Sequence, residues 1–342
     1  MYTYIGCRTT KERNARGLGI RIFDVNEKWI PSTIVDSFDN PSYLITDNNK
    51  KFIYAVHGDF DKVSSYKIEG DGNLTFLNRV DSTGKNPVYM VCSRDNRFVF
   101  VATLQGGTVA TLPRLADGSL GEAIYTYHLG GIVPDGVSHA HQCILDQSGK
   151  YLFVPTQGRG IGYERIWCFA IDEKTGKLEL VSTVDAPEGS ELRHLVITKD
   201  NKRIYCINEK GNYVSSYNFD SDMGTLSLQQ EISSLPEGYT GKGQASAIIL
   251  SPDQNHLYVT NRLHDSITTY RIDTITGTLE FIDNVSTGKT PRFAMMSPVG
   301  DEIWVANEDS DTIQIFSINC DGTLSLKENS IKAESPTCIL PI

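Results

Sequence analysis

A histidine, three arginines and a glutamate have the side chains needed to hold an anion and to move a proton. They are His141, Arg193, Glu209, Arg262 and Arg292. Guanidinium groups bind carboxylate or phosphate oxygens through paired N–H donors and can stabilise negative charge that develops on an oxygen. An imidazole or a carboxylate can act as general base or general acid. The set predicts proton-transfer chemistry on an anionic small molecule, provided that the fold brings these residues together.

The elements that must position these residues belong to a repeat. Each unit begins with a short apolar run and carries an aromatic residue thirteen positions later, and the starts lie 45 to 53 residues apart. The six complete pairs are Pro41 and Tyr54, Pro87 and Phe100, Ala140 and Phe153, Leu192 and Tyr205, Ala245 and Tyr258, and Pro291 and Trp304. A seventh run starts at Pro336, and the missing strands of that unit are found at the N-terminus, in residues 1–6, 19–23 and 29–35.

A period of this length, divided into short apolar stretches by turn residues, is typical of a propeller blade of four antiparallel strands. Six units carry a late Gly-Xaa-Leu hairpin marker, at Gly72, Gly118, Gly176, Gly224, Gly277 and Gly322. Glycine supplies the positive φ that such a tight turn requires. The sequence therefore predicts an all-β fold, a seven-bladed β-propeller formed by residues 1–342 as a single domain. The N-terminal strands are expected to pair with the C-terminal strand in one closing blade.

The repeat also predicts which side chains meet. In a propeller the first strand of a blade lies nearest the axis and the second runs back beside it, so position +1 of the repeat and position +17 share one face. Position +1 holds Ser42, Val88, His141, Arg193, Ser246, Arg292 and Thr337, and position +17 holds Gly58, Leu104, Gln157, Glu209, Arg262 and Glu308. Such a sector could hold an anion while His141 or Glu209 moves a proton. The alternative is a channel wall of solvated or salt-bridged polar residues.

The other histidines are less promising. His139 precedes its strand, and strand alternation predicts that His194 points away from the site, so both are expected to be structural. His57 and His264 lie near strand ends without an assignable partner. The sequence has no GxSxG motif, and its Asp, His and Cys residues lack a compact metal-ligand spacing. We therefore expect neither a metal nor a cofactor.

Composition restricts the possible partners. The chain has 42 acidic and 32 basic side chains, a net charge of −10, and no dense Lys/Arg tract, which disfavours nucleic acid. No segment approaches the roughly 18 to 20 apolar residues of a membrane span. The first residues lack the features of a secretory signal, and the seven cysteines form no CxxC pair, so we expect a cytoplasmic protein with buried, reduced thiols.

Three segments carry a family resemblance. Residues 138–155, the Leu192-Arg-His-Leu run with Asn208-Glu209 beyond it, and residues 251–262 resemble the seven-bladed lactonase family, and the likeness runs over essentially the whole chain. That family includes propeller-type 6-phosphogluconolactonases and carboxy-cis,cis-muconate cyclases. Two departures concern substrate identity: Leu192 stands where the family often has Pro, and Thr156-Gln-Gly where it has Asp-Leu-Gly.

The resemblance implies an enzyme that hydrolyses a sugar lactone without a metal, with 6-phosphogluconolactone or a related aldonolactone as substrate. It assigns catalysis to His141, Arg193 and Glu209, with Arg193 stabilising the oxyanion. Arg262 and Arg292 would hold a phosphate or carboxylate, and Ser246 and Gln157 are expected to help bind the substrate. The sequence does not assign the base between His141 and Glu209. Two alternatives stay open, cyclisation of an unsaturated dicarboxylate and a non-catalytic binding propeller.

Overall fold

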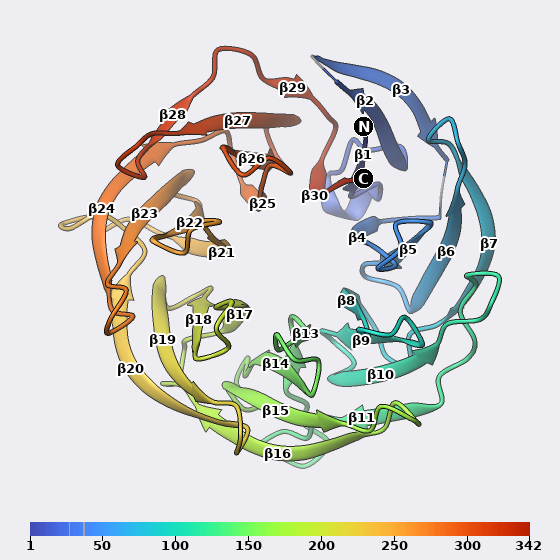
Figure 1. Ribbon diagram of the computed structural model, residues 1–342, viewed down its shortest axis with the longest axis horizontal. Coiled ribbons are helices and arrows are strands. Elements are labelled where there is room, and N and C mark those ends of the chain that lie inside the picture. Colours follow the sequence, from blue (N-terminus) through green and yellow to red (C-terminus); the bar gives the residue numbers. More distant parts are fainter. Residues whose placement is uncertain (27, 37) are drawn as a thin grey trace.

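The computed structural model describes residues 1–26, 28–36 and 38–342 and arranges the strands of these residues as seven sheets around a central axis (Figure 1). We number the sheets as blades, starting with the one that contains Pro41. Blade 1 consists of β4 (Pro41–Thr46), β5 (Phe52–His57), β6 (Lys62–Ile68) and β7 (Leu74–Asp81). Blade 2 consists of β8 (Pro87–Cys92), β9 (Phe98–Thr103), β10 (Thr108–Pro113) and β11 (Tyr125–His128). Blade 3 has a divided inner strand, β12 (His139–Ala140) and β13 (Ile144–Leu145), followed by β14 (Tyr151–Gln157), β15 (Arg165–Ile171) and β16 (Leu178–Asp185).

The remaining blades follow the same order from the axis outwards. Blade 4 consists of β17 (Leu192–Ile197), β18 (Arg203–Asn208), β19 (Tyr213–Asp220) and β20 (Thr225–Ser233). Blade 5 consists of β21 (Gln244–Leu250), β22 (His256–Arg262), β23 (Ser266–Ile272) and β24 (Leu279–Ser286). Blade 6 consists of β25 (Pro291–Met296), β26 (Glu302–Asn307) and β27 (Thr312–Ile318), with β28 (Leu324–Leu326) and β29 (Ile331–Lys332) both paired to β27.

Blade 7 closes the ring and joins the two ends of the chain. Its strands lie in the order β30 (Pro336–Pro341), β1 (Tyr2–Cys7), β2 (Ile20–Val25) and β3 (Trp29–Val35), and the 3-10 helix η1 (Lys11–Arg13) lies between β1 and β2. The backbone N–H of Ile342 donates a hydrogen bond to the carbonyl of Tyr2 at 2.9 Å. The predicted propeller and its closing blade are thus confirmed.

The repeated aromatic residue and the repeated hairpin glycine contact each other across blades. The hydroxyl of Tyr54 donates to the carbonyl of Gly118 at 3.0 Å, and Tyr258 donates in the same way to Gly322. Tyr4 donates to Gly72 at 2.7 Å and is therefore the seventh aromatic residue of the repeat, which the count along the chain had not reached. Each contact joins the second strand of one blade to the outer hairpin of the next, so the two sequence signals serve one purpose, holding neighbouring blades together.

The inner strands share a β-bulge at their axial ends. The inner strand has one residue more than its partner strand at this place in six blades. In blade 1 the extra residue lies between Pro41 and Tyr43, in blade 4 between Leu192 and His194, and blades 2, 5, 6 and 7 have it at the matching place. In blade 3 the break between β12 and β13 falls at the same place. Since a bulge redirects the side chain of the extra residue, the residues at position +1 turn towards the axis.

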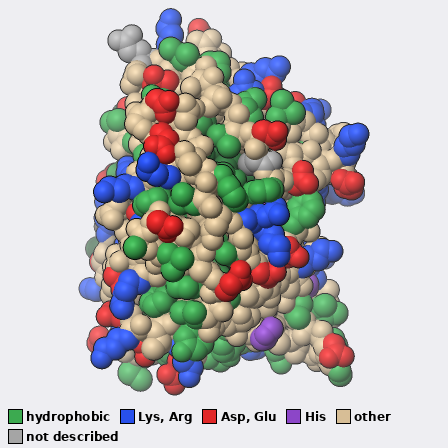
Figure 2. Space-filling view, turned by 90° about the vertical axis from the view of Figure 1, so that its right-hand side faces the viewer, with side chains coloured by type: hydrophobic (Ala, Val, Ile, Leu, Met, Phe, Trp, Pro, Cys, Tyr) green, Lys and Arg blue, Asp and Glu red, His purple; other side chains and the backbone are tan. Residues whose placement is uncertain are grey.

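The outer wall has a mixed character. On the side shown in Figure 2, acidic and basic side chains are interspersed with scattered apolar ones. No helix among the described residues is long and apolar enough to cross a membrane.

Candidate active site

The residues at position +1 line a narrow pocket on the axis, which we call the axial pocket. Its lining consists of Arg8, Ser42, Tyr43, Val88, His141, Arg193, His194, Arg292, Phe293 and Thr337. Six of the seven position +1 residues are among them. The exception is Ser246, which is fully buried and whose hydroxyl donates to the carbonyl of Arg292 at 2.7 Å. Ser246 therefore supports the backbone beneath Arg292 in this structure.

Glu209 is the centre of an ion-pair cluster contributed by blades 3, 4 and 5. It follows β18, and its Oε1 lies 3.0 Å from Nη2 of Arg262, at the end of β22. Its Oε2 lies 3.2 Å from Nε of Arg193 and 3.8 Å from Nε2 of His141. The amide of Gln157, at the end of β14, donates to the same oxygen at 3.2 Å. The structure thus brings together five of the residues selected from the repeat.

The charge state of Glu209 follows from these neighbours. Its side chain is 15% exposed, and burial alone would raise the pKa of a carboxyl group. The guanidinium groups of Arg262, Arg193 and Arg292 outweigh that effect and lower the pKa of Glu209 to about 2. Glu209 is therefore a carboxylate at every pH near neutrality, and its oxygens are occupied by cations.

His141 has the opposite character. It is 7% exposed, and burial, followed by the positive charges of Arg193 and Arg292, lowers its pKa well below 6.5. Its Nδ1 is buried without a hydrogen-bond partner among the described residues. The imidazole is thus neutral at pH 7 and has a nitrogen free to accept a proton, while its Nε2 faces the carboxylate of Glu209.

Arg193 is fixed in place by its surroundings. It is the extra residue of the bulge in β17 and is 4% exposed. Its Nη1 donates to the carbonyl of Ser246 at 2.5 Å and lies 3.2 Å from Nδ1 of His194. Its Nε lies near Glu209 but makes no hydrogen bond to a described residue, which leaves this N–H with unused donor capacity.

The orientation expected for His194 is wrong. Alternation along an unbroken strand places His194 on the face opposite Arg193, but the bulge between Leu192 and His194 shifts the register by one residue. His194 therefore lines the axial pocket with Arg193, and its ring centroid lies 5.2 Å from that of His141. Burial and the charge of Arg193 lower the pKa of His194 well below 6.5, so it is neutral as well.

Arg8 is the site residue that sequence reasoning missed. It directly follows β1, is 3% exposed and lines the axial pocket. Because β1 is the second strand of the blade that begins with Pro336, Arg8 is the equivalent in blade 7 of the position +17 residues. Arg8 follows Tyr4 by four residues, as Glu209 follows Tyr205, so aligning blade 7 on its aromatic residue would have found it. A straight count from Pro336 through the two termini instead reaches position +17 at Lys11.

One end of the axial pocket is closed by an aromatic layer of Tyr43, Tyr89 and Phe293. Tyr43 and Tyr89 are stacked with ring centroids 4.2 Å apart, Tyr43 contacts Phe293, and Tyr89 contacts His194. Beyond this layer the channel widens to a mainly apolar cavity of about 240 Å³. Ligands with charged groups are therefore expected to bind on the polar side of the aromatic layer.

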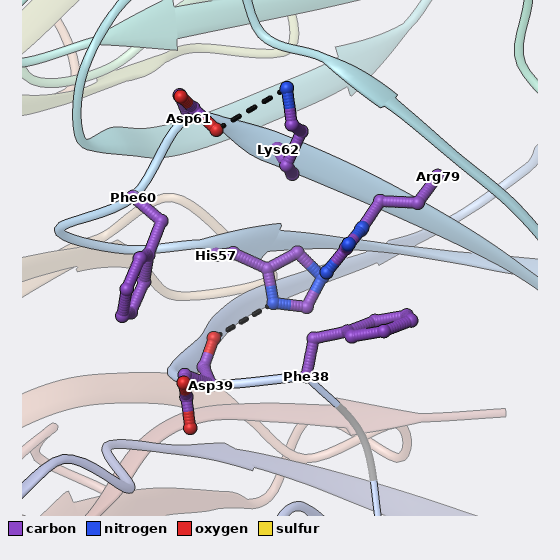
Figure 3. Close-up of a pocket in the computed structure, with 7 residues that line it drawn as sticks. All are labelled: Phe38, Asp39, His57, Phe60, Asp61, Lys62 and Arg79. Atoms are coloured by element: carbon purple, nitrogen blue, oxygen red, sulfur yellow. Dashed lines mark hydrogen bonds and ion pairs between the residues drawn. The ribbon is translucent and has the colours of Figure 1, made fainter.

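A second pocket, of about 350 Å³, lies in blade 1 outside the axial region (Figure 3). His57 lies in it, but its Nδ1 contacts the carbonyl of Asp39 at 2.8 Å and its Nε2 contacts the hydroxyl of Ser64 at 2.7 Å. Lys62 is paired with Asp61 at 3.4 Å and with Asp81 at 2.8 Å. Both ring nitrogens and the ammonium group are thus already engaged, so this pocket is a weaker candidate for proton transfer.

The remaining sequence candidates have local partners. His139 contacts the carbonyl of Leu104 through Nδ1 at 2.7 Å, in keeping with the structural role expected of it, and His264 contacts the hydroxyl of Ser266. Within residues 1–26, 28–36 and 38–342, no group of three or more His, Cys, Asp and Glu side chains is placed to hold a metal ion.

Known proteins resemble this chain over nearly its full length. A 6-phosphogluconolactonase of Bacillus subtilis is 26% identical over 308 residues, which cover 88% of this chain and 86% of that protein. A 6-phosphogluconolactonase of Formosa agariphila is 28% identical over 335 residues, 92% of this chain and 91% of the relative. The structure of a periplasmic gluconolactonase from Pseudomonas aeruginosa superposes with a TM-score of 0.86 at 26% identity, covering 99% of this chain and 98% of the other. The family model described as "Lactonase, 7-bladed beta-propeller" matches residues 2–341, and the chain therefore belongs to the seven-bladed β-propeller lactonase family.

Proposed function

We propose that this protein hydrolyses a sugar lactone that carries an anionic group, with 6-phosphogluconolactone as the first candidate. The observation that carries the proposal is the cluster in which Glu209 lies between Arg193 and Arg262, with the neutral imidazole of His141 at 3.8 Å. This arrangement combines a proton acceptor, a fixed positive charge for an oxyanion and further cations for a charged substrate. Membership of the lactonase family supports the same reaction class.

In this proposal His141 is the general base. Its pKa lies below 6.5, so it is unprotonated at neutral pH, whereas Glu209 is bound on both oxygens and has a pKa of about 2. A carboxylate with so low a pKa has little driving force to take a proton from water, and the base is best when its pKa lies nearer the working pH. Glu209 instead holds Arg193 and Arg262 and faces the imidazolium that forms when His141 takes the proton.

The reaction then proceeds in two balanced steps. A water oxygen bonds to the lactone carbonyl carbon while His141 accepts the proton of that water, and the carbonyl oxygen becomes an oxyanion. The N–H at Nε of Arg193, which makes no hydrogen bond to a described residue, stabilises the negative charge of this oxyanion. The bond between the carbonyl carbon and the ring oxygen breaks next, and the proton held by His141 passes to that oxygen. The product is the open hydroxy acid.

The substrate class follows from the excess of guanidinium groups. The overall charge of −10 repels anions at long range, so their binding depends on local positive charge. Arg262 and Arg292 supply it, in support of a phosphate or carboxylate on the substrate. The relatives include proteins named 6-phosphogluconolactonase and one named gluconolactonase, so the phosphorylated and the unphosphorylated lactone are the two substrates to compare.

Two further predictions belong to the proposal. Gln157 and Ser246 position the charged groups, Gln157 through Glu209 and Ser246 through Arg193 and Arg292. The cytoplasmic location also stays a prediction. The gluconolactonase of Pseudomonas aeruginosa is named as periplasmic, so cell fractionation is needed to test the location of this protein.

The test is lactone hydrolysis followed by pH-stat, with spontaneous hydrolysis subtracted. His141→Gln is expected to lower kcat/KM by about 10²- to 10⁴-fold, the usual contribution of a general base, and Arg193→Gln by about 10²- to 10³-fold. His128→Gln is the matched control, because His128 is an exposed residue of the outer strand β11. A His141→Ala, Glu209→Gln double variant with full activity on every responsive lactone would refute the proposal. Product analysis with an unsaturated dicarboxylate checks the alternative, in which the ring is closed and not opened.

A further inference from the structure

The axial pocket is lined by Arg8, which directly follows the N-terminal strand β1, as well as by residues of blades 3 and 4. Arg8 lines it together with His141, Arg193 and Arg292. Among the described residues, the lining of this pocket contains three guanidinium groups and no carboxylate. Concentrated positive charge in a closed space calls for an anionic ligand.

Gly58 shows that the space for Arg8 is built into the fold. It is the position +17 residue of blade 1, where other blades have side chains such as Glu209 and Arg262. A Cβ atom added at Gly58 would lie 2.6 Å from Nη1 of Arg8 and 2.6 Å from Oγ of Ser42. The absence of a side chain at Gly58 therefore lets the guanidinium of Arg8 cross from blade 7 into the gap beside blade 1.

The acidic partner of Arg8 is shared. Nη1 of Arg8 contacts Oδ2 of Asp59 at 2.9 Å, and Nε of Arg13 contacts the same oxygen at 2.8 Å. Nε of Arg8 is buried without a hydrogen-bond partner among the described residues. Burial, and next to it the charge of Arg292, lowers the pKa of Arg8 to about 10. Arg292 has a carboxylate partner of its own, because its Nη1 lies 3.2 Å from Oε2 of Glu308. Each guanidinium carries five N–H donors, so Arg8 and Arg292 line the pocket with donors beyond those that Asp59 and Glu308 engage, and such donors suit a phosphate or carboxylate.

We propose that Arg8 and Arg292 form an oxyanion subsite for a phosphate or carboxylate group at the far end of the lactone that His141 and Arg193 open. The free space of the axial pocket is about 30 Å³, room for about two water molecules, so a ligand brings oxygen atoms to its lining while the sugar ring lies outside the pocket. This inference rests on the proposed function for the identity of the lactone. The anion site itself is testable without turnover.

The first experiment measures anion binding with inorganic phosphate as the probe. Isothermal titration calorimetry on the full chain is expected to show phosphate binding that weakens about 10- to 100-fold in Arg8→Gln, the effect of losing a hydrogen-bonded charge. Arg13→Gln is the matched control, because Arg13 has the same Asp59 partner but a side chain that is 45% exposed, outside the pocket lining. It is expected to bind phosphate as the unmodified protein does.

The second experiment separates the two anions and tests specificity. Arg8→Gln is expected to lower kcat/KM for 6-phosphogluconolactone by about 10- to 100-fold while changing that for glucono-δ-lactone by less than about threefold. An aldarolactone, which has a terminal carboxylate, shows which anion the subsite prefers. Arg8→Lys, which keeps the charge, is expected to restore part of the selectivity.

Gly58→Ala is a second variant that tests the subsite in case Arg8→Gln loses activity because it misfolds. It leaves every charge in place but displaces the guanidinium of Arg8, so it is expected to reproduce the selective loss if it keeps the melting temperature of the parent protein. Equal losses on both lactones, or unchanged phosphate binding in Arg8→Gln, would show that Arg8 is only a structural partner of Asp59. A protein that opens no lactone but loses phosphate binding in Arg8→Gln would disprove the proposed function and leave the subsite intact.

Discussion

At the scale of single residues, His141 and Glu209 lie beside the same arginines and have different charge states at neutral pH. The carboxylate of Glu209 is in direct contact with two guanidinium groups, which stabilise its charged form. Burial of the His141 imidazole, and after it the positive charges of Arg193 and Arg292, disfavours its charged form. The arginines thus keep Glu209 ionised, burial and the same arginines keep His141 neutral, and the pair is ready for proton transfer through His141.

The dependence of activity on pH tests this division of roles. Since the free base is the active form and the pKa of His141 lies below 6.5, kcat/KM is expected to stay level through neutral pH and to fall only below pH 6.5. Arg292→Gln removes one of the charges that lower this pKa, so the fall should begin at a higher pH. An unphosphorylated lactone is the right substrate, because a phosphate group itself titrates near pH 6. An acid limb that does not move in Arg292→Gln would contradict the role of His141.

Counting along the repeat predicts which positions lie at the site, but it does not predict the contacts that each side chain makes there. His141, Arg193, Glu209 and Arg262 were selected by position alone, and the structure places them around one carboxylate. Arg8 escaped because its blade is split between the two ends of the chain. Ser246 was selected by the same count, but its hydroxyl donates a hydrogen bond to the backbone carbonyl of Arg292. The sequence alone does not indicate that hydrogen bond.

At the scale of elements, the bulge in each inner strand explains both the success and the error of the sequence reasoning. Hydrophobic alternation and turn residues identify strands, but they do not indicate where a strand carries an extra residue. The repeat located position +1 correctly, since the bulge recurs at the same place in the blades. Plain alternation failed for His194, which directly follows the bulge in β17.

The contacts between blades lead to a prediction about stability. Tyr258→Phe removes the hydroxyl that donates to Gly322 at 3.0 Å and keeps the ring, and Phe already occupies the equivalent position in Phe100 and Phe153. The loss of one hydrogen bond costs about 1 kcal/mol, which corresponds to a fall of about 1–2 °C in the melting temperature of a chain of this size. Scanning calorimetry measures it, with Tyr125→Phe on the outer strand β11 as the control. An unchanged melting temperature in Tyr258→Phe would show that the hydroxyl contact adds nothing to blade packing.

At the scale of the whole molecule, the site depends on ring closure. Pocket residues come from blades on both sides of the closing blade, and Arg8 and Thr337 belong to the closing blade itself. The inner strand β30 packs between β1, β4 and β25, and its Cys338 and Ile339 are buried. Loss of this strand would therefore disturb the wall of the axial pocket as well as the core.

Removal of residues 336–342 is the corresponding experiment. It eliminates the backbone hydrogen bonds between β30 and β1 and the burial of Ile339, together several kcal/mol, so the melting temperature is expected to fall by about 10 °C. Lactone hydrolysis should be lost with it. Ile34→Pro is the comparison, because β3 is the outermost strand of the same blade and already contains Pro31. This variant should lose little stability and retain hydrolysis, since the site lies on inner strands. If the truncated protein kept its melting temperature and activity, closure by β30 would be dispensable and the site would depend on the six other blades alone.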